Sequence, residues 1–597
     1  MNKFQTIGRN PIWLTVPALA VLLVVFSVPL IQLFLTSLNV PAFSLANYQA
    51  FFSRPAYLRV LFQTVEISVV ATAICLIIGY PMAYLMVACS KQLRMTLIAL
   101  VIIPYLTSGL VRTYAWIAIL GDRGLINNLF LSLGIIFSPL PLIYNRAAVY
   151  IGMVHIMLPM MILPLVSSMI GVDKSLVAAA RSMGARPFTA FWRVFLPLTL
   201  PGIRSGCLLV FVVCLGFYIT PAALGGLGDA MLSNFISSQM ATSFNFAPAA
   251  TASFILLAVA VVVLSFVGLD LAGTPAGGAK PGWKSYFGRL IVSHRLKRYF
   301  DKIGTRRRAS QWAAGLYRAE DPRRLAKVAG FVFIVLVLFY LLFPEIVVVV
   351  MSFGAGSFLE FPPSGLSLQW YRNFFGDPSW NGAALTSVQI GIVVALLATF
   401  VGTIAAYGLG RVQPRVSGLL NMVILTPITI PVIVVGIAAY LGLSDFGLIG
   451  SKAGIVLAHS LGAISYVVVI VSATLTNFDR RLEQAAMSMR AGPARAFWRV
   501  TLPLIRPGII GGAFFAFLHS FDEVVITSLV SGFAIRTLPL KMWENIRNQI
   551  DPTIAAVASL LMLLPVLWLV ILYFAWWRAQ PSARVLDQTM ATNPGDA

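Results

Sequence analysis

Charged residues inside apolar stretches are the features of this sequence that point most directly to chemistry. These stretches hold four acidic residues and one basic residue: Glu66, Glu345, Asp522, Glu523 and Arg112. A charge in hydrocarbon costs roughly 2.5 to 3.5 kcal/mol on insertion scales, so a retained charge usually faces a cavity or a partner. The acidic excess favours a path for a small cation such as an amine, because phosphate or sulfate would need converging Arg, Lys or helix N-termini.

Asp522 is the residue we expect to line such a path. The alternative is a buried ion pair with Arg112, since paired charges inside membranes are common. Glu523 follows Asp522 directly in the sequence. Neighbouring residues on a helix point about 100° apart, so both carboxylates cannot face one spot. One of the two is therefore expected to be structural.

The other two carboxylates have structural alternatives of their own. Glu66 lies one turn after Gln63 in the middle of its stretch, and it suits either the path or a hydrogen bond between helices. Glu345 follows Pro344 near the end of its stretch, and we expect it to be structural.

Aromatic side chains could complete a site for an alkylammonium group through cation–π contacts. The candidates are Tyr114, Trp116, Tyr218 and Trp543. Each of them also suits packing or a position at the membrane interface. Three histidines in apolar stretches lack the spacing of a metal site and are expected to be hydrogen-bonded core residues: His155, His459 and His519.

Membrane-spanning helices must position these residues, because the chain is too apolar for a soluble globule. It is 59% hydrophobic and 11% charged, with a mean hydropathy of +0.88. A bilayer needs about 20 apolar residues per helix. Runs near that length predict an all-α membrane protein with two six-helix halves, at residues 13–38, 60–86, 95–120, 147–170, 201–224, 249–271, 328–353, 384–408, 417–443, 454–475, 508–529 and 553–577.

The basic residues predict the orientation of these spans, since Lys and Arg are retained on the cytoplasmic side. Most of the 43 Lys and Arg residues fall in connections that are inside if both termini are cytoplasmic. Charge dispersed in this way argues against a nucleic-acid partner. The basic linker at 272–327 joins the halves, and its stretch 283–303 suits either a helix on the anionic inner leaflet or a solvated tether.

A close repeat divides the chain into homologous halves, 1–271 and 328–597. LVAAARSMGARPFTAFWRVFLPLTLPGI at 176–203 recurs 306 residues later as LEQAAMSMRAGPARAFWRVTLPLIRPGI. Upstream, Tyr48 and Phe51 match Tyr371 and Phe374 at an offset of 323. The change of offset predicts extra residues around 127–145 in the first half, on the outside, which suit either an asymmetric docking surface or a neutral insertion.

The repeated element resembles the EAA loop of ABC importer permeases, a cytoplasmic helix-turn-helix that fits a groove on the ATPase subunit. PYLTSGLVRTYAWIAILGDRGLINN and HSFDEVVITSLVSG look like the two permease subunits of spermidine/putrescine importers, fused here in one chain. The resemblance implies the type I importer fold in the bacterial inner membrane, two copies of an ATPase subunit and a periplasmic or extracellular binding protein. It also implies a cationic amine substrate, with an opine, 4-aminobutyrate, another amino compound or a metal as alternatives.

The resemblance assigns ATPase coupling to loops at 172–204 and 478–507, which depart from the family pattern. The coupling positions are Ala179, Ala180, Gly184, Ala485, Ala486 and Arg490. The family glutamate is replaced by Ala178 and Gln484, and Arg490 replaces the glycine of the second copy. Loss of the acid should weaken the ATPase contact unless Asp173, Glu483 or the partner compensates.

No phosphate-binding G-x-x-x-x-G-K-[ST] motif occurs in the sequence. We therefore expect this chain to hold no cofactor and not to be an enzyme, with ATP and magnesium bound by separate subunits. The competing class is a twelve-span secondary transporter. That class would place acidic relay residues in the spans of both halves, whereas the closest internal identity here lies in the loops.

Overall fold

The computed structural model of the chain describes residues 11–243, 245–267, 322–356, 361–532, 534–548 and 551–579. These residues are almost wholly helical, and the β pairing among them is an isolated bridge between Gly354 and Leu366. The expected linker at 272–327 lies outside the described residues except for its last six, which begin a helix. The stretch 283–303 lies wholly outside them.

The first half contains fourteen described α-helices, preceded by a 3-10 turn at Pro11–Thr15. They are α2 (Val16–Leu22), α3 (Val28–Ser37), α4 (Ala46–Ser53), α5 (Pro55–Ala88), α6 (Lys91–Leu106), α7 (Gly109–Leu120), α8 (Leu125–Ser132), α9 (Arg146–Ile170), α10 (Lys174–Ser182), α11 (Pro187–Ala190), α12 (Leu196–Leu215), α13 (Ile219–Leu224), α14 (Leu232–Thr242) and α15 (Ala247–Val267).

The second half repeats most of this order among its described residues. Its helices are α18 (Pro322–Met351), α19 (Gln369–Gly376), α20 (Pro378–Leu409), α21 (Pro414–Thr429), α22 (Val432–Asp445), α23 (Lys452–Thr476), α24 (Arg480–Ser488), α25 (Pro493–Ala496), α26 (Leu502–Asp522), α27 (Val525–Val530), α28 (Leu538–Asn548) and α29 (Thr553–Ala579). α8 has no counterpart, because the chain passes from α22 to α23 through a short loop. This confirms the extra segment that the change of offset predicted.

Eight described helices are long and apolar enough to cross a membrane, and two bent helix pairs raise the number to ten. The spans predicted at 95–120 and 417–443 are not single straight helices, since α6 meets the α7–α8 segment at 90° and α21 meets α22 at 102°. Both α6 and α21 have a proline near their end, which removes a backbone donor. Pro431 also favours an extended conformation for the residue before it.

Two further predicted spans, 201–224 and 508–529, are also interrupted. α12 ends at Leu215 and α26 ends at Asp522, and each is followed by a separate six-residue helix. Glu523 therefore lies beyond the end of α26, in an extended backbone conformation. The expected 100° separation of Asp522 and Glu523 on one helix does not apply.

Small residues allow equivalent helices to pack closely in both halves. A Cβ added to Gly202 on α12 would lie 2.4 Å from Cβ of Ser168 on α9, and one on Gly508 of α26 would lie 2.1 Å from Oγ1 of Thr474 on α23. Close approach of this kind is typical of helix packing in membranes. The matching positions confirm that the two halves share one architecture.

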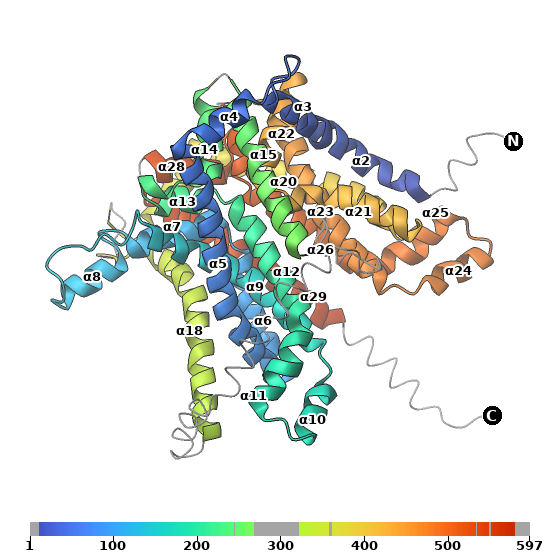
Figure 1. The fold of residues 1–597 in the computed structure, drawn as a ribbon, viewed down its shortest axis with the longest axis horizontal. Coiled ribbons are helices and arrows are strands. Elements are labelled where there is room, and N and C mark those ends of the chain that lie inside the picture. Colours follow the sequence, from blue (N-terminus) through green and yellow to red (C-terminus); the bar gives the residue numbers. More distant parts are fainter. Residues whose placement is uncertain are drawn as a thin grey trace.

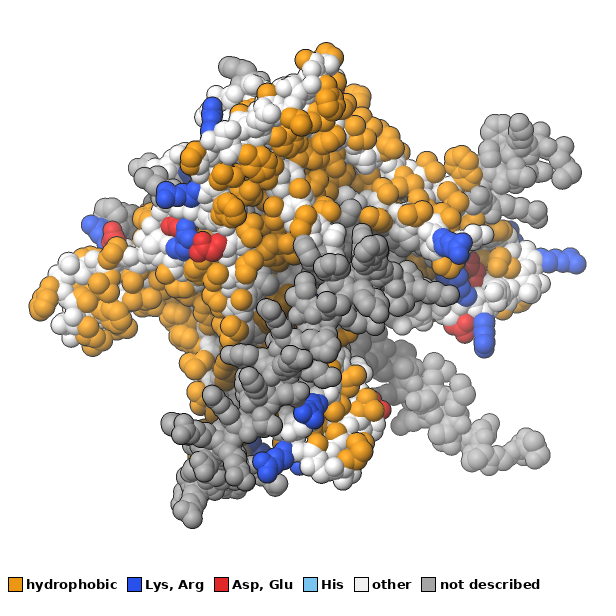
Figure 2. Space-filling view, in the orientation of Figure 1, with side chains coloured by type: hydrophobic (Ala, Val, Ile, Leu, Met, Phe, Trp, Pro, Cys, Tyr) orange, Lys and Arg blue, Asp and Glu red, His pale blue; other side chains and the backbone are white. Residues whose placement is uncertain are grey.

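The two halves contact each other along α18, which packs against α5, α6 and α7, and along α2 and α3, which pack against α20 and α22. The loop formed by α10 and α11 and the loop formed by α24 and α25 lie at separate corners of the molecule (Figure 1). The face drawn in Figure 2 is largely covered by hydrophobic side chains with few charges. Such a surface suits a chain whose helices lie in a membrane.

Candidate functional site

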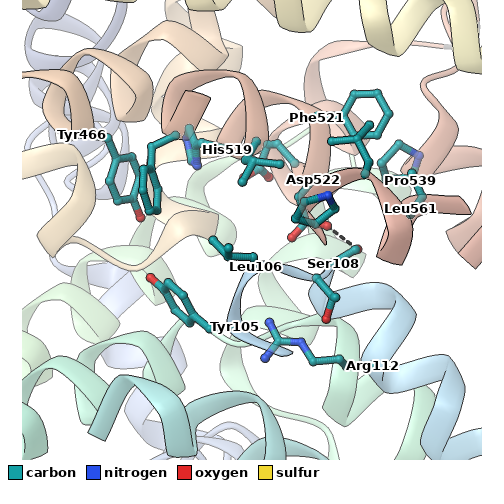
Figure 3. A pocket seen from close by; sticks show the side chains of 16 residues that line it. Tyr105, Leu106, Ser108, Arg112, Tyr466, His519, Phe521, Asp522, Pro539 and Leu561 are labelled. Carbon is teal, nitrogen blue, oxygen red and sulfur yellow. Dashed lines mark hydrogen bonds between the residues drawn. The ribbon is translucent and has the colours of Figure 1, made fainter. Parts of the chain in front are cut away.

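Two cavities of about 230 and 300 Å³ lie where the two halves meet. The first is bounded by the break between α6 and α7, by α26 and by α29 (Figure 3). The second also reaches the break between α21 and α22 and the end of α12. Both cavities are lined by Arg112, Tyr466, His519, Asp522 and Glu523.

Asp522 joins the two halves at these cavities. Its carboxylate accepts a hydrogen bond from Ser108 Oγ and one of 3.3 Å from the backbone N–H of Gly109. Ser108 is the N-cap of α7, and a helix N-terminus favours negative charge. The side chain is exposed to the interior of the cavities rather than buried in the surrounding helices. A carboxylate from the second half thus binds the start of a helix from the first half.

Arg112 approaches the cavity from the side opposite Asp522 (Figure 3). The arginine is only 5% exposed, and its Nη1 donates to the carbonyl of Ile156 over 3.2 Å. Its Nε has no hydrogen-bond partner within the described part of the chain. No carboxylate of the described residues lies within 4.0 Å of its guanidinium group. The alternative of a direct Asp522–Arg112 ion pair is therefore absent from this arrangement.

Glu345 on α18 is the second carboxylate bound at the same break. Thr107 Oγ1 donates a 2.8 Å hydrogen bond to its Oε1, and the residue is 8% exposed. The neighbouring hydroxyls of Thr107 and Ser108 therefore each hold a carboxylate from the second half. The equivalent break carries Ile430 and Pro431, which have no hydroxyl groups.

Glu523 lines both cavities but is 9% exposed. Its Oε1 accepts a 2.8 Å hydrogen bond from the backbone N–H of Ile526, in the first turn of α27. This bond holds the carboxylate in the turn that follows α26. Glu523 is thus engaged within its own segment, while Asp522 reaches across to the other half.

Glu66 lines neither cavity. Its side chain is 55% exposed and forms a 3.1 Å ion pair with Arg146, which also binds Asp229 over 3.0 Å. Arg146 was not among the predicted residues, because the predicted span begins one residue later, at 147. In this arrangement Glu66 links α5 to α9, as expected for a contact between helices.

The aromatic candidates separate into two groups. Tyr218 lines the second cavity, and its ring lies 5.5 Å from that of Trp543, which is outside both linings. Trp116 packs 5.7 Å from the rings of His155 and Tyr340, away from the cavities. Tyr114 is fully buried in the core. Tyr218 is therefore the aromatic candidate that the fold brings to the charged residues.

Two of the three histidines are hydrogen-bonded core residues as predicted. His155 contacts the carbonyl of Leu341 over 3.1 Å, and His459 contacts Ser520 and Thr527 over 2.9 Å each. His519 differs, because it lines both cavities. Its Nε2, like Nδ1 of His155, has no hydrogen-bond partner among the described residues. The described residues contain no His, Cys, Asp and Glu group that could hold a metal ion.

The two loops that resemble EAA loops have the same backbone shape. Asp173 caps α10 through the N–H of Ser175 over 2.8 Å, and Asp479 caps α24 in the same way over 2.9 Å. The hydroxyl and backbone N–H of Ser175 lower the pKa of the Asp173 carboxyl. Four of the positions expected to couple to an ATPase, Ala179, Ala180, Ala485 and Ala486, lie on these two helices.

Gly184 and Arg490 end these helices in the left-handed region, with φ of +85° and +62°. Glycine adopts this conformation without strain, whereas arginine does not. The replacement of glycine in the second copy therefore keeps the shape of the loop and adds strain to it.

Neither acid proposed as a substitute for the family glutamate is free. Asp173 is the N-cap of α10. Glu483 is 6% exposed, accepts a 2.6 Å hydrogen bond from the Tyr407 hydroxyl and forms an ion pair with Arg411. Both carboxylates therefore stabilise this chain itself.

The loops also expose apolar residues that were not predicted from the sequence. Met183 and Met489 are 82% and 83% exposed, and Leu176 and Leu482 are each 48% exposed. These residues occupy equivalent positions in the repeat. An identical apolar residue at the same position of both polar loops could have indicated this exposure from the sequence.

Comparison with known proteins identifies related sequences. The model of the family described as "Binding-protein-dependent transport system inner membrane component" matches residues 75–271 and 398–580. The spermidine/putrescine transport system permease protein PotB of Haemophilus influenzae is 37% identical over 268 residues, which are 45% of this chain and 93% of that protein. The putrescine transport system permease protein PotI of Escherichia coli is 32% identical over 234 residues, covering 37% and 82%.

A solved structure of a bacterial alginate ABC transporter, in complex with an alginate pentasaccharide-bound periplasmic protein, also aligns with this chain. It covers 45% of this chain and 96% of that chain at 17% identity, with a TM-score of 0.36. A score of this size supports no argument about the present fold.

Proposed function

Because this chain belongs to the family of binding-protein-dependent transport system inner membrane components, with two copies of the family domain in one polypeptide, we propose that it is the permease of an ATP-driven amine importer. Its two halves form one translocation path for a small cationic amine such as putrescine or spermidine. The names of the PotB and PotI relatives support this substrate class.

The position of Asp522 is the observation that carries the substrate assignment. Its carboxylate lies in both cavities at the junction of the halves, bound by Ser108 and by the N-terminus of α7. A protonated amine offers the same kind of donor to a carboxylate, with a full positive charge. When the halves separate, an amine can replace the donors of the first half, and Tyr218 supplies an aromatic ring nearby.

The two loops support coupling to a pair of ATPase subunits. Each loop presents an exposed methionine and leucine at matching positions, as expected if the same partner surface binds twice. ATP and magnesium are bound by those subunits on the cytoplasmic side. Both termini of this chain lie on the same side. Approach of the two ATPases would draw the loops together and rock the halves as rigid bodies, opening the path toward a binding protein on the opposite face.

Uptake by reconstituted vesicles tests this function. The chain, its ATPase subunit and its binding protein are placed in proteoliposomes, and entry of labelled putrescine and spermidine is followed with and without ATP. Uptake that requires all three proteins and ATP is expected. Uptake that follows a proton gradient without the ATPase would indicate a secondary transporter instead. ATP-dependent entry of 4-aminobutyrate, an opine or a metal but of neither amine would overturn the substrate assignment alone.

A further inference from the structure

The segment at residues 124–145 forms a projection that is present in the first half alone. It consists of α8 and the chain that returns from it to α9, and we refer to it as the α8 hairpin. α8 extends sideways from α7, beyond the helices of the first half (Figure 1). The α8 hairpin is therefore longer than a simple connection between α7 and α9 and exposes a surface of its own.

Asn127 holds the hairpin in a defined shape. This residue is fully buried, and its amide donates to the carbonyls of Gly121 and Leu140 over 3.1 and 3.0 Å. Its Oδ1 accepts a 2.8 Å hydrogen bond from the N–H of Leu140. One side chain thus ties the base of α8 to the segment that returns from its tip, so the tip is presented by an ordered support.

A second asparagine fixes the hairpin to the other half of the chain. Asn128 Nδ2 donates to the carbonyl of Arg123 over 2.9 Å and to that of Phe361 over 3.1 Å. Phe361 lies between α18 and α19, in the second half. The hairpin therefore lies across the boundary of the two halves at its base, while its tip points away from both.

The tip of the hairpin is apolar and exposed. Leu133 is 63% exposed, Ile135 is 61% exposed and Phe137 is 99% exposed. No Lys, Arg, Asp or Glu occurs between Arg123 and Arg146. Soluble surfaces rarely expose large apolar patches of this kind, and protein docking sites usually surround theirs with polar or charged groups.

The neighbouring surface shows which environment covers this tip. α18 packs against α7, and its own outward residues are apolar, with Phe339 54% and Ile346 58% exposed. α18 ends at Met351 beside α7, at the end of the molecule away from the α10–α11 loop (Figure 1). The exposed surface of this spanning helix is therefore apolar, like that of the hairpin tip.

We propose that the α8 hairpin inserts its apolar tip into the lipid bilayer, in the leaflet remote from the two coupling loops. Uncharged apolar side chains on an ordered support match the interfacial and acyl region of a membrane. The hairpin thereby anchors the first half beside the junction with the second. A docked binding protein is the competing occupant, and the test below separates the two.

Photo-cross-linking from the tip provides the test. The full chain carries a benzophenone amino acid in place of Phe137, and it is reconstituted in vesicles of phosphatidylethanolamine and phosphatidylglycerol. Irradiation is expected to add the mass of a phospholipid at this position. Ile77 on α5, which is 71% exposed on a spanning helix, serves as the lipid-facing control. Asp122, which is exposed at the base of the hairpin, serves as the aqueous control.

Each outcome decides for or against lipid insertion. A lipid adduct at positions 137 and 77 but not at 122, unchanged when the binding protein is added, supports the proposal. A lipid adduct at 77 with none at 137 overturns it, as does an adduct between position 137 and the binding protein. The same substitution at Ile135 provides a second position on the tip, so that poor incorporation at one site does not prevent a decision.

Discussion

Gly216 packs so closely against Pro431 that a Cβ added to the glycine would lie 3.0 Å from both Cα and Cβ of the proline. Gly216 is equivalent to Asp522 and Pro431 is equivalent to Ser108, and this second pair, again with one residue from each half, is joined by a hydrogen bond. Both contacts connect the end of a long helix in one half to the break of a bent helix pair in the other. The same junction therefore occurs twice, once apolar and once charged.

A side chain at Gly216 should weaken the apolar junction. Gly216→Ala places its methyl group against the backbone of Pro431, which is less able to move aside than a flexible side chain. Overpacking of this kind costs about 1 to 3 kcal/mol. We expect a lower midpoint of thermal unfolding for the purified chain. Gly418→Ala on α21 is the matched control, because an added Cβ there meets no atom within 4 Å. Equal midpoints for the two variants would contradict the close contact.

Arg490 should be replaceable by glycine with a gain in local stability. A left-handed conformation costs a residue other than glycine roughly 1 to 2 kcal/mol. Replacement by glycine removes this cost, but part of the gain is offset because glycine has more conformational freedom in the unfolded chain. Arg490→Gly should therefore slow amide exchange at the end of α24 by an amount equal to about 1 kcal/mol. The reverse change, Gly184→Ala, should accelerate exchange at the end of α10. Faster exchange in Arg490→Gly, or slower exchange in Gly184→Ala, would refute the strain assigned to Arg490.

The Glu483–Arg411 ion pair should hold the second loop to α20. Arg411→Ala leaves the carboxylate of Glu483 buried without its cation, which costs about 3 kcal/mol in a fully buried pair and less here, because the Arg411 side chain is 20% exposed. We expect faster exchange across α24 and weaker recovery of the ATPase with the chain. The exposed Arg415 provides the control, and Arg415→Ala should leave both measurements unchanged. Identical behaviour of the two variants would show that the pair does not position the loop.

The sequence predicted the two halves and the two loops because their residues are repeated in order. The offset of 306 between the repeated loops also places Gly216 opposite Asp522, so this acid has no acidic counterpart. The partner of Asp522 could not be predicted from the sequence, because Ser108 lies 414 residues away and only the fold brings the two together.

The breaks at Thr107 and Pro431 were missed for a physical reason. Hydropathy remains high on both sides of each break. Two extended residues between the helices therefore leave no mark in the hydropathy of the sequence. The role of Glu66 was left open for a similar reason, since its partner Arg146 stands at the edge of a span. Boundaries of predicted spans are uncertain by a few residues, which is enough to hide an ion pair.

The initial rate of ATP-dependent putrescine uptake by three variants tests the central claim that Asp522 serves the amine path. Asp522→Asn removes the charge and keeps the size, Ser108→Ala removes a donor and keeps the charge, and Glu544→Gln neutralises a carboxylate paired with Arg536 outside the cavities. A charge-assisted hydrogen bond contributes about 1.5 to 3 kcal/mol, so loss of the Asp522 charge should slow uptake about tenfold or more. Ser108→Ala should have a smaller effect, and Glu544→Gln should have little. Normal uptake by Asp522→Asn, at a rate equal to that of Glu544→Gln, would contradict the account.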